Sequence, residues 1–400
     1  MQVQLQNELF ERGAGGIENY LYYFSKTLLT LGHEPIILCA QSQPHAPANE
    51  VSEGVRIIRH PPFRFRGVLF PLYARSHEKM LQRFIGRNLT DVDLIVSRHP
   101  DYAYASCKIA PRLPVVYVQA AVWPEKLKST VRHISWRATL FATLTRRQER
   151  NIELQTLRLC DQIIVLSHSK KRHSAEYYHL SEERFKVIPP GVDLDRFTPR
   201  QRDARLLKEL GIPLDAGVIL TVCRLSSEKN VQMLLKATAL MDDSPCFVVV
   251  VGDGPERAHL QRLAANLGLV DRVRFTGLRT DVQRFYSIAD VFVLPSIEEG
   301  FGHVFLEAMA SGLPCIGLAS DYPHVITASD EIIEHGRSGF CADPYSTADL
   351  AEKIDTVLKD DKLRHRLGKK SREICEKNYS WRRHVTAVME TVEKTKDKTF

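Results

Sequence analysis

The stretch EEGFGHVFLE at residues 298–307 decides the fold, because two glycines in it join an apolar strand to a helix. The strand is expected at residues 291–294, and the helix should begin near Gly302 and end at the sequence SGLP at 311–314. In an open α/β sheet, ligands bind where the strands end, and the unpaired amides at a helix start favour a phosphate. This stretch therefore predicts a ligand site at a sheet edge.

The same stretch carries two carboxylates. Glu299 precedes the helix and Glu307 lies one to two turns inside it, so the two can reach different parts of one extended ligand. Ionised carboxylates only accept hydrogen bonds, which suits the hydroxyls of a sugar. A capped helix with two solvated glutamates is the alternative, and the spacing, the glycines and the preceding strand together favour the ligand site.

Apolar, β-branched runs alternate with longer amphipathic stretches along the chain, which indicates an α/β protein with mostly parallel sheets in two doubly wound units. The turn-rich sequence PPGVD at 189–193, continuing to Pro199, predicts the linker. It separates a first domain at 1–190 from a second at 200–380. The expected strands are 3–5, 35–38, 55–59, 94–97, 115–118, 163–166 and 186–188, then 218–223, 247–251, 273–276, 291–294 and 315–318. The segment 362–396 is expected to be helical, with a break at 379–381.

Two cations follow the expected strand at 218–223. Ser226 or Ser227 can cap the next helix, which would place Lys229 in its first turn and Arg224 at the strand end. A lysine there is unfavourable against the helix dipole unless an anion lies between them. Arg224 and Lys229 therefore resemble a clamp for a diphosphate, and a solvated surface pair is the alternative.

Two further glycine-rich turns follow strands. In GDGPER at 252–257 the third glycine of a dinucleotide fingerprint would fall on Arg257, so Gly252 and Gly254 predict a turn that lets backbone approach a nucleotide, not an NAD site. The sequence GAGG at 13–16 permits close approach of a phosphate or sugar to Gly15 and Gly16, and a flexible loop is the alternative.

Composition narrows the class of protein. The 400 residues carry a net charge of +7, and the surplus lies in residues 1–200, where arginines alternate with aromatic residues. The eight cysteines form no C-x-x-C pair, which argues against a zinc site or a disulfide framework and favours reduced thiols in a cytoplasmic protein. We find no signal peptide and no apolar run long enough to span a bilayer.

These motifs together resemble glycosyltransferase family 4, whose members are retaining GT-B enzymes that use nucleotide-activated sugars. The resemblance covers nearly the whole chain and rests on seven features. They are the glycine loop at 13–16, the linker IPPGVD with Phe197, the pair Arg224 and Lys229, GDGP at 252–255, FTG at 275–277, EGFG at 299–302 and Glu307.

The resemblance implies a role for each matching residue. Arg224 and Lys229 would neutralise the leaving diphosphate, Glu299 would bind the hydroxyls of the transferred sugar, and Glu307 would bind those of the ribose. The remaining donor-binding residues would be Gly15, Gly16, Gly252, Gly254, Thr276, Gly277, Gly302, His303 and Val304. The helix after Trp381 would cross back and complete the first domain with about 381–400, as in other GT-B enzymes.

The chain departs from the family after the strand at 115–118. Many members carry a histidine there, whereas this chain reads QAAVW at 119–123. His99, which ends another strand and would point into the cleft between the domains, or Gln119 would then supply a hydrogen bond on the acceptor side. Residues 117–126 resemble the lipopolysaccharide-core glucosyltransferase branch.

The expected function is retaining transfer of a hexose from a UDP- or GDP-sugar to a hydroxyl of an acidic or membrane-associated glycan or glycolipid, in bacterial cell-envelope polysaccharide or lipopolysaccharide biosynthesis. No metal or other cofactor is expected. The alternatives are another GT-B enzyme such as a sugar-nucleotide 2-epimerase, a transferase with a small soluble acceptor, and a basic protein that binds membrane surfaces. We expect no nucleic-acid partner, because no recognition module is present. The expected location is the cytoplasm, with residues 126–150 able to lie on the anionic inner face of the plasma membrane.

Overall fold

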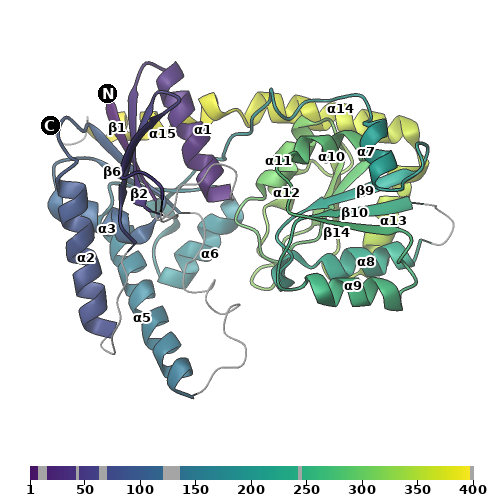
Figure 1. Cartoon of the computed structure of the whole chain (residues 1–400), viewed down its shortest axis with the longest axis horizontal. Coiled ribbons are helices and arrows are strands. Elements are labelled where there is room, and N and C mark those ends of the chain that lie inside the picture. Colours follow the sequence, from purple (N-terminus) through teal and green to yellow (C-terminus); the bar gives the residue numbers. More distant parts are fainter. Residues whose placement is uncertain (8–15, 42–44, 63–69, 120–135, 242–245, 397–400) are drawn as a thin grey trace. The chain divides into compact units, whose positions relative to one another are not determined.

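The computed structural model describes residues 1–7, 16–41, 45–62, 70–119, 136–241 and 246–396, and the chain forms two compact units (Figure 1). The first contains Met1–Leu166, Ser174–Ile188 and His384–Phe400, and the second contains Ser167–His173 and Pro189–Arg383. Each unit has its own sheet and its own apolar core. The prediction of an α/β protein with two doubly wound domains is therefore confirmed.

An eight-stranded sheet forms the centre of the first unit, in the order β3-β4-β2-β1-β5-β6-β7-β8. All neighbouring strands are parallel except β3 and β4. The sequence analysis did not predict β3, because its residues NEVS are polar and mostly exposed. The strands are β1 (Gln2–Gln6), β2 (Glu34–Ala40), β3 (Asn49–Ser52), β4 (Val55–His60), β5 (Leu94–Ser97), β6 (Val115–Gln119), β7 (Gln162–Val165) and β8 (Phe185–Val187).

Helices pack on this sheet through its apolar side chains. Ile36 and Leu38 of β2 contact a layer that includes α2 and α3, and the core continues along β6 and β7 toward the end of α5. Because strands in such a sheet are buried on both faces, they appear in the sequence as continuous apolar runs. The helices are α1 (Gly16–Thr30), α2 (Phe70–Gly86), α3 (Pro100–Ile109), α5 (Trp136–Leu159), α6 (His168–Tyr178), which belongs to this unit from Ser174 onward, and, at the end of the chain, α15 (Trp381–Lys396).

The last helix joins the first unit from His384 onward. The His384 ring nitrogen Nε2 lies 2.7 Å from the hydroxyl of Tyr20 on α1, and both side chains are buried. The expected break between the last two helices is confirmed, because α14 ends at Asn378 and α15 begins at Trp381.

A six-stranded parallel sheet forms the centre of the second unit, in the order β11-β10-β9-β12-β13-β14. The strand β14 was not predicted, since its sequence GFCA is short and begins with a glycine. A Cβ at Gly339 would lie 1.9 Å from the carbonyl oxygen of Cys315 on β13, so only glycine fits there. The strands are β9 (Gly217–Val222), β10 (Cys246–Val251), β11 (Val273–Gly277), β12 (Val291–Leu294), β13 (Cys315–Leu318) and β14 (Gly339–Ala342).

Helices cover both faces of this second sheet, with α8 and α9 on one face and α10 and α11 on the other (Figure 1). The core includes Val248, Val250 and Val293 from the strands and Leu234 and Leu235 from α8. The helices are α7 (Ala204–Glu209), α8 (Val231–Ala239), α9 (Arg257–Asn266), α10 (Val282–Ile288), α11 (His303–Ala310), α12 (Ser329–Ile332), α13 (Thr347–Lys359) and α14 (Asp361–Asn378).

The strand order of the second unit fixes where a ligand can bind. From β9 the chain proceeds outward through β10 and β11, and then returns to place β12 on the other side of β9. The chain therefore leaves β9 and β12 toward opposite edges of the sheet, and in open α/β sheets this point is the usual ligand site. Among the described helices, none is long and apolar enough to span a membrane.

Candidate functional site

Backbone hydrogen bonds join the loop after β12 to the loop after β9 and to the segment that follows β13. The amide of Ile297 donates to the carbonyl of Glu228 at 2.9 Å, and the amide of Ile326 donates to the carbonyl of Ile297 at 2.9 Å. The amide of Glu299 in turn donates to the carbonyl of Ile326 at 2.8 Å. The three loops are thus held together through their backbones as well as through any side-chain contact between them.

Lys229 and Glu299 form an ion pair across these loops. The Lys229 Nζ atom lies 2.5 Å from a carboxylate oxygen of Glu299, and each side chain is 17% exposed. Burial alone would lower the pKa of Lys229, but the charge and the hydrogen bond of Glu299 outweigh it and raise that pKa above its ordinary value. Lys229 is therefore a cation throughout the neutral pH range. The structure thus brings two predicted residues of opposite charge into contact.

The predicted position of Lys229 in a helix is wrong. Lys229 ends a short 3₁₀ turn, Ser227–Lys229, and α8 begins only at Val231. Asn230 between them has a left-handed backbone, with φ of 50°, so the turn and the helix do not form one continuous element. Ser226 caps nothing and instead donates its hydroxyl to Glu228 at 2.5 Å. The helix-dipole argument for an anion therefore does not apply to Lys229, and its charge is balanced by Glu299.

Arg224 differs from Lys229 in its exposure. It lies two residues beyond the end of β9 and is exposed. Within the part of the chain that the structure describes, no carboxylate pairs with its guanidinium. The loop after β9 thus presents one exposed arginine beside one partly buried, paired lysine.

The structure gives the glycines at 252 and 254 a packing role that the sequence did not indicate. A Cβ at Gly252 would lie 1.9 Å from the carbonyl oxygen of Cys223, and one at Gly254 would lie 2.3 Å from that of Leu225. The Leu225 amide donates to the carbonyl of Asp253 at 2.9 Å, which holds the two turns together. The close approach is therefore made by the protein's own backbone, and it supports the loop that carries Arg224. A contact of these glycines with a nucleotide remains a prediction.

The start of α11 agrees with the prediction. Gly302 is the N-cap, with φ of 89° and no side-chain cap, and the amides of His303 and Val304 begin the helix. A Cβ at Gly302 would lie 2.8 Å from a ring carbon of Phe305, so a larger residue would disturb the turn. Free amides at the N-terminus of an eight-residue helix give a local positive potential beside Glu299.

Glu307 lies on α11 in an environment unlike that of Glu299. One of its carboxylate oxygens accepts a hydrogen bond of 2.9 Å from the hydroxyl of Tyr286 on α10. Burial is the largest influence and raises the pKa of Glu307 to about 7, while the Tyr286 bond and the charge of Arg196 act to lower it. Near neutral pH this carboxylate can therefore change its charge.

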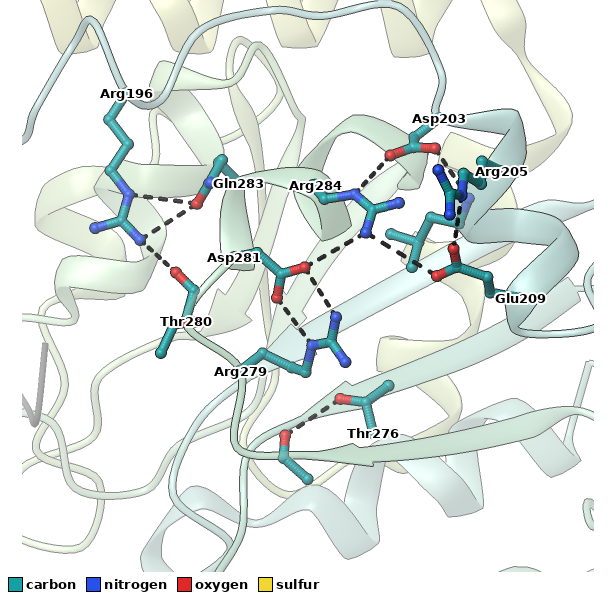
Figure 2. A network of polar contacts seen from close by, with 12 residues as sticks. Arg196, Asp203, Arg205, Glu209, Thr276, Arg279, Thr280, Asp281, Gln283 and Arg284 are labelled. Carbon is teal, nitrogen blue, oxygen red and sulfur yellow. Dashed lines mark hydrogen bonds and ion pairs between the residues drawn. The ribbon is translucent and has the colours of Figure 1, made fainter.

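The turn after β11 is held by the polar network of Figure 2. Arg279 donates to both carboxylate oxygens of Asp281, at 2.9 and 2.8 Å, and these bonds lower the pKa of Asp281. Arg284 on α10 donates to Asp203 at 2.8 Å. The hydroxyl of Thr276 is directed to backbone carbonyls at 3.2 and 3.4 Å. The predicted residues Thr276 and Gly277 thus enter a turn that arginines and carboxylates fix in place.

In the first unit the acceptor-side candidates are buried and already hydrogen-bonded. Gln119 donates its amide to Glu153 at 2.8 Å and accepts from the hydroxyl of Ser174 at 2.7 Å. His99 caps α3 by accepting from the amide of Asp101 at 3.3 Å. Their contact with an acceptor remains a prediction.

Several expectations fall outside the described residues. Gly15 lies in 8–15, and Gly16 is described only as the first backbone position of α1. The proposed membrane segment at 126–150 lies partly in 120–135, and the side chains up to 146 are likewise outside the description.

Sequence reasoning missed Tyr286 and Arg196. Tyr286 is 1% exposed and belongs to an apolar pattern, so the sequence alone does not distinguish it from an ordinary core residue. Arg196 lies in the linker, and its charge alone did not indicate that it belongs to the candidate site. No group of three histidine, cysteine or acidic side chains suited to a metal occurs within the described part of the chain.

Two family models match the chain. One, described as glycosyl transferases group 1, matches residues 203–374, and the other, described as glycosyltransferase family 4, matches residues 14–196. The two matches fall on either side of the segment 197–202, close to the division between the two units.

Two curated relatives share about a third of their aligned residues with the chain. The N-acetyl-alpha-D-glucosaminyl L-malate synthase of Bacillus anthracis is 31% identical over 50% of this chain and 53% of its own length. The D-inositol 3-phosphate glycosyltransferase of Corynebacterium jeikeium is 33% identical over 59% of this chain and 60% of its own length. The chain thus spans between half and two thirds of the length of these relatives.

Solved structures share the fold over the full chain. HepE of Anabaena, crystallised with UDP and glucose, superposes with a TM-score of 0.73 at 20% identity, and the match covers 98% of this chain and 100% of that one. At this identity the likeness concerns the fold.

Proposed function

Because this chain belongs to glycosyltransferase family 4, we propose that it transfers a hexose, with retention of configuration, from a nucleoside diphosphate sugar to an acceptor hydroxyl. The observation that carries this proposal is the set of groups around the ends of β9 and β12. A lysine and a glutamate form a partly buried pair there, an arginine lies exposed beside them, and the start of α11 faces the same loop. The family supplies the type of reaction, and these groups supply its chemistry.

Each group has a distinct task in the proposed reaction. When the sugar leaves its nucleotide, negative charge develops on the diphosphate, and fixed positive groups aimed at that charge lower the barrier. Arg224, Lys229 and the amides of α11 are the candidates for this work. Glu299 would accept hydrogen bonds from the transferred sugar while also holding Lys229 in place, and Glu307 would accept them from the ribose.

The sequence and the relatives favour two kinds of acceptor. One candidate is an acidic or membrane-associated glycan, because the surplus of basic residues lies in the first half of the chain. A second candidate, a small acidic alcohol, is favoured by the names of the two relatives, which contain L-malate and D-inositol 3-phosphate. Both candidates offer a hydroxyl and bring a negative charge, on the acceptor itself or on the membrane surface, which the basic first half would attract.

A product assay tests the proposal. The protein is incubated with UDP- and GDP-hexoses and with L-malate, inositol phosphate or a lipid-linked glycan, and the product is analysed by NMR for its anomeric configuration. Sugar transfer with a retained α or β configuration supports the proposal. Conversion of the donor without any acceptor would instead indicate an epimerase, and an inverted product would contradict retention.

Co-sedimentation with anionic vesicles separates the acceptor candidates. Salt-sensitive binding to the vesicles favours a membrane-associated acceptor, because charge attraction weakens as salt screens it. Transfer to a soluble acid without vesicle binding favours the small acceptor.

A further inference from the structure

The linker residues 193–197 are fixed to the two helices that flank Glu307. The guanidinium of Arg372 on α14 donates to the carbonyls of Phe197 at 2.8 Å, of Leu194 at 3.4 Å and of Ala310, the last residue of α11, at 2.6 Å. The linker is therefore attached to the helix that carries Glu307.

Arg196 attaches the same linker to α10. Its guanidinium donates to the carbonyl of Thr280 at 2.9 Å and to the side-chain oxygen of Gln283 at 3.2 and 3.3 Å (Figure 2). Its own amide donates to Asp193 at 2.9 Å, which fixes the backbone of the linker at this point. A charged side chain with this many bonds has little freedom to move.

Tyr286 on α10 completes the connection. Its ring lies 5.7 Å from that of Phe197 in the linker, edge to face, and 6.0 Å from that of Phe292 on β12. The buried ring points its hydroxyl at Glu307 at 2.9 Å, with the carbonyl of Val304 at 3.4 Å as a weaker acceptor. A hydroxyl has one proton, so Tyr286 donates it to the nearer acceptor, the Glu307 carboxylate.

We propose that Tyr286 is a positioning residue, which orients the Glu307 carboxylate for the ribose hydroxyls of the donor, and that Arg196 assists it from the linker. This inference rests on the proposed function, in which Glu307 binds the ribose. An ionised carboxylate accepts hydrogen bonds from two neighbouring hydroxyls at a lower cost when its plane is already fixed, and the Tyr286 bond to one oxygen fixes that plane.

The same contacts govern the ionisation of Glu307. Burial favours its neutral form, and the groups that oppose burial are Tyr286 from α10 and Arg196 from the linker. Cys315 of β13 acts on the tyrosine, because its charge raises the pKa of Tyr286. Removal of the Tyr286 hydroxyl therefore raises the pKa of Glu307, and a smaller fraction of the carboxylate is charged at pH 7.

The test measures nucleotide affinity against pH by calorimetry, with UDP and GDP as probes, for the wild type, Tyr286→Phe, Glu307→Gln and the double variant. Tyr286→Phe should weaken binding about tenfold at pH 7, the usual effect of losing a hydrogen bond to a charged group. It should also move the midpoint of the curve of affinity against pH to a higher pH. The loss should disappear in the double variant and with a 2′,3′-dideoxynucleotide, because neither retains the carboxylate–ribose contact.

Two controls separate positioning from a general loss of structure. Tyr345→Phe removes a hydroxyl that also bonds a carboxylate, Asp321 at 2.5 Å, but on an exposed side chain, and should leave affinity unchanged. Arg196→Met should move the pH midpoint in the same direction as Tyr286→Phe, whereas Arg196→Lys, which keeps the charge, should largely restore it. The two Arg196 variants test the inference even if Tyr286→Phe folds poorly.

The outcomes distinguish the inference from the function on which it rests. If Glu307→Gln binds nucleotide as tightly as the wild type, the ribose role of Glu307 is wrong and the inference falls with it. Suppose instead that Glu307→Gln weakens binding. Only the inference is wrong if Tyr286→Phe leaves the midpoint of the affinity–pH curve in place, or if it weakens binding as much in the Glu307→Gln background as in the wild type.

Discussion

Glu299 and Glu307 belong to one short motif, yet their surroundings are opposite. Glu299 lies on a loop, paired with Lys229 at 2.5 Å, whereas Glu307 lies inside a helix and has a tyrosine hydroxyl as its bonded partner. The pair raises the pKa of Lys229, and burial raises the pKa of Glu307 to about 7. The difference teaches that two carboxylates of one motif can have different electrostatic surroundings, because Glu299 contacts a cation whereas burial disfavours the charged form of Glu307.

The largest expected effect is at the Glu299 end, where Lys229→Met removes the paired cation. The activation barrier should rise by about 2–4 kcal/mol, which lowers turnover roughly 30- to 1,000-fold. The reason is that the charge on the diphosphate loses its fixed partner and Glu299 loses its counter-ion. Initial rates at saturating donor measure the effect.

Lys353→Met is the matched control for this variant. Lys353 is 19% exposed and paired with Asp349, which resembles the burial and pairing of Lys229, but it lies on α13. Its turnover should stay close to that of the wild type. Near wild-type turnover of Lys229→Met would show that the cation assignment is wrong.

The next effect is at the Glu307 end and concerns stability. Because the folded pKa of about 7 lies above the ordinary value of 4.5, the stability that Glu307 contributes is fully present below that ordinary value and is lost as pH rises through 7. The free energy of unfolding of Glu307→Gln, relative to that of the wild type, should therefore increase by about 2–3 kcal/mol between pH 5 and pH 8.

Urea unfolding at several pH values measures this gain. A stability difference between Glu307→Gln and the wild type that does not change with pH would contradict the assigned environment of Glu307. It would also remove the contrast with Glu299.

The smallest effect should come from the exposed cation. Arg224→Ala should weaken nucleoside diphosphate binding about fivefold, and the loss should shrink at high salt, because an exposed charge is screened. Calorimetric titrations at low and high salt measure both quantities. A loss of affinity that does not change with salt would contradict the exposed position of Arg224.

The sequence predicted the two sheets well because parallel strands buried on both faces appear as continuous apolar runs, such as FVVVV at 247–251. It missed β3, which is polar and exposed, and β14, which needs a glycine for contact with β13. It also placed Lys229 inside a helix, since a left-handed Asn230 cannot be distinguished in a sequence from a helical one.

The candidate site was predicted in its polar residues and not in their partners. Lys229 and Glu299 were assigned separate roles, and nothing in the sequence showed that they touch across 70 residues. The close packing of Gly252 against Cys223 was missed for the same reason, because Cys223 lies in the loop after another strand. Pairings of this kind depend on strand order, which motif spacing does not encode.

Thermal unfolding of the wild type with UDP, GDP and their hexose derivatives tests the central claim most directly. A ligand that binds only the folded state at 100 times its dissociation constant adds about 2.7 kcal/mol of stability. We predict a dose-dependent rise in the unfolding temperature with one nucleoside diphosphate, reduced by Lys229→Met and by Glu307→Gln. No rise with any of these ligands at millimolar concentration would contradict the claim that the second unit holds a nucleotide-sugar site.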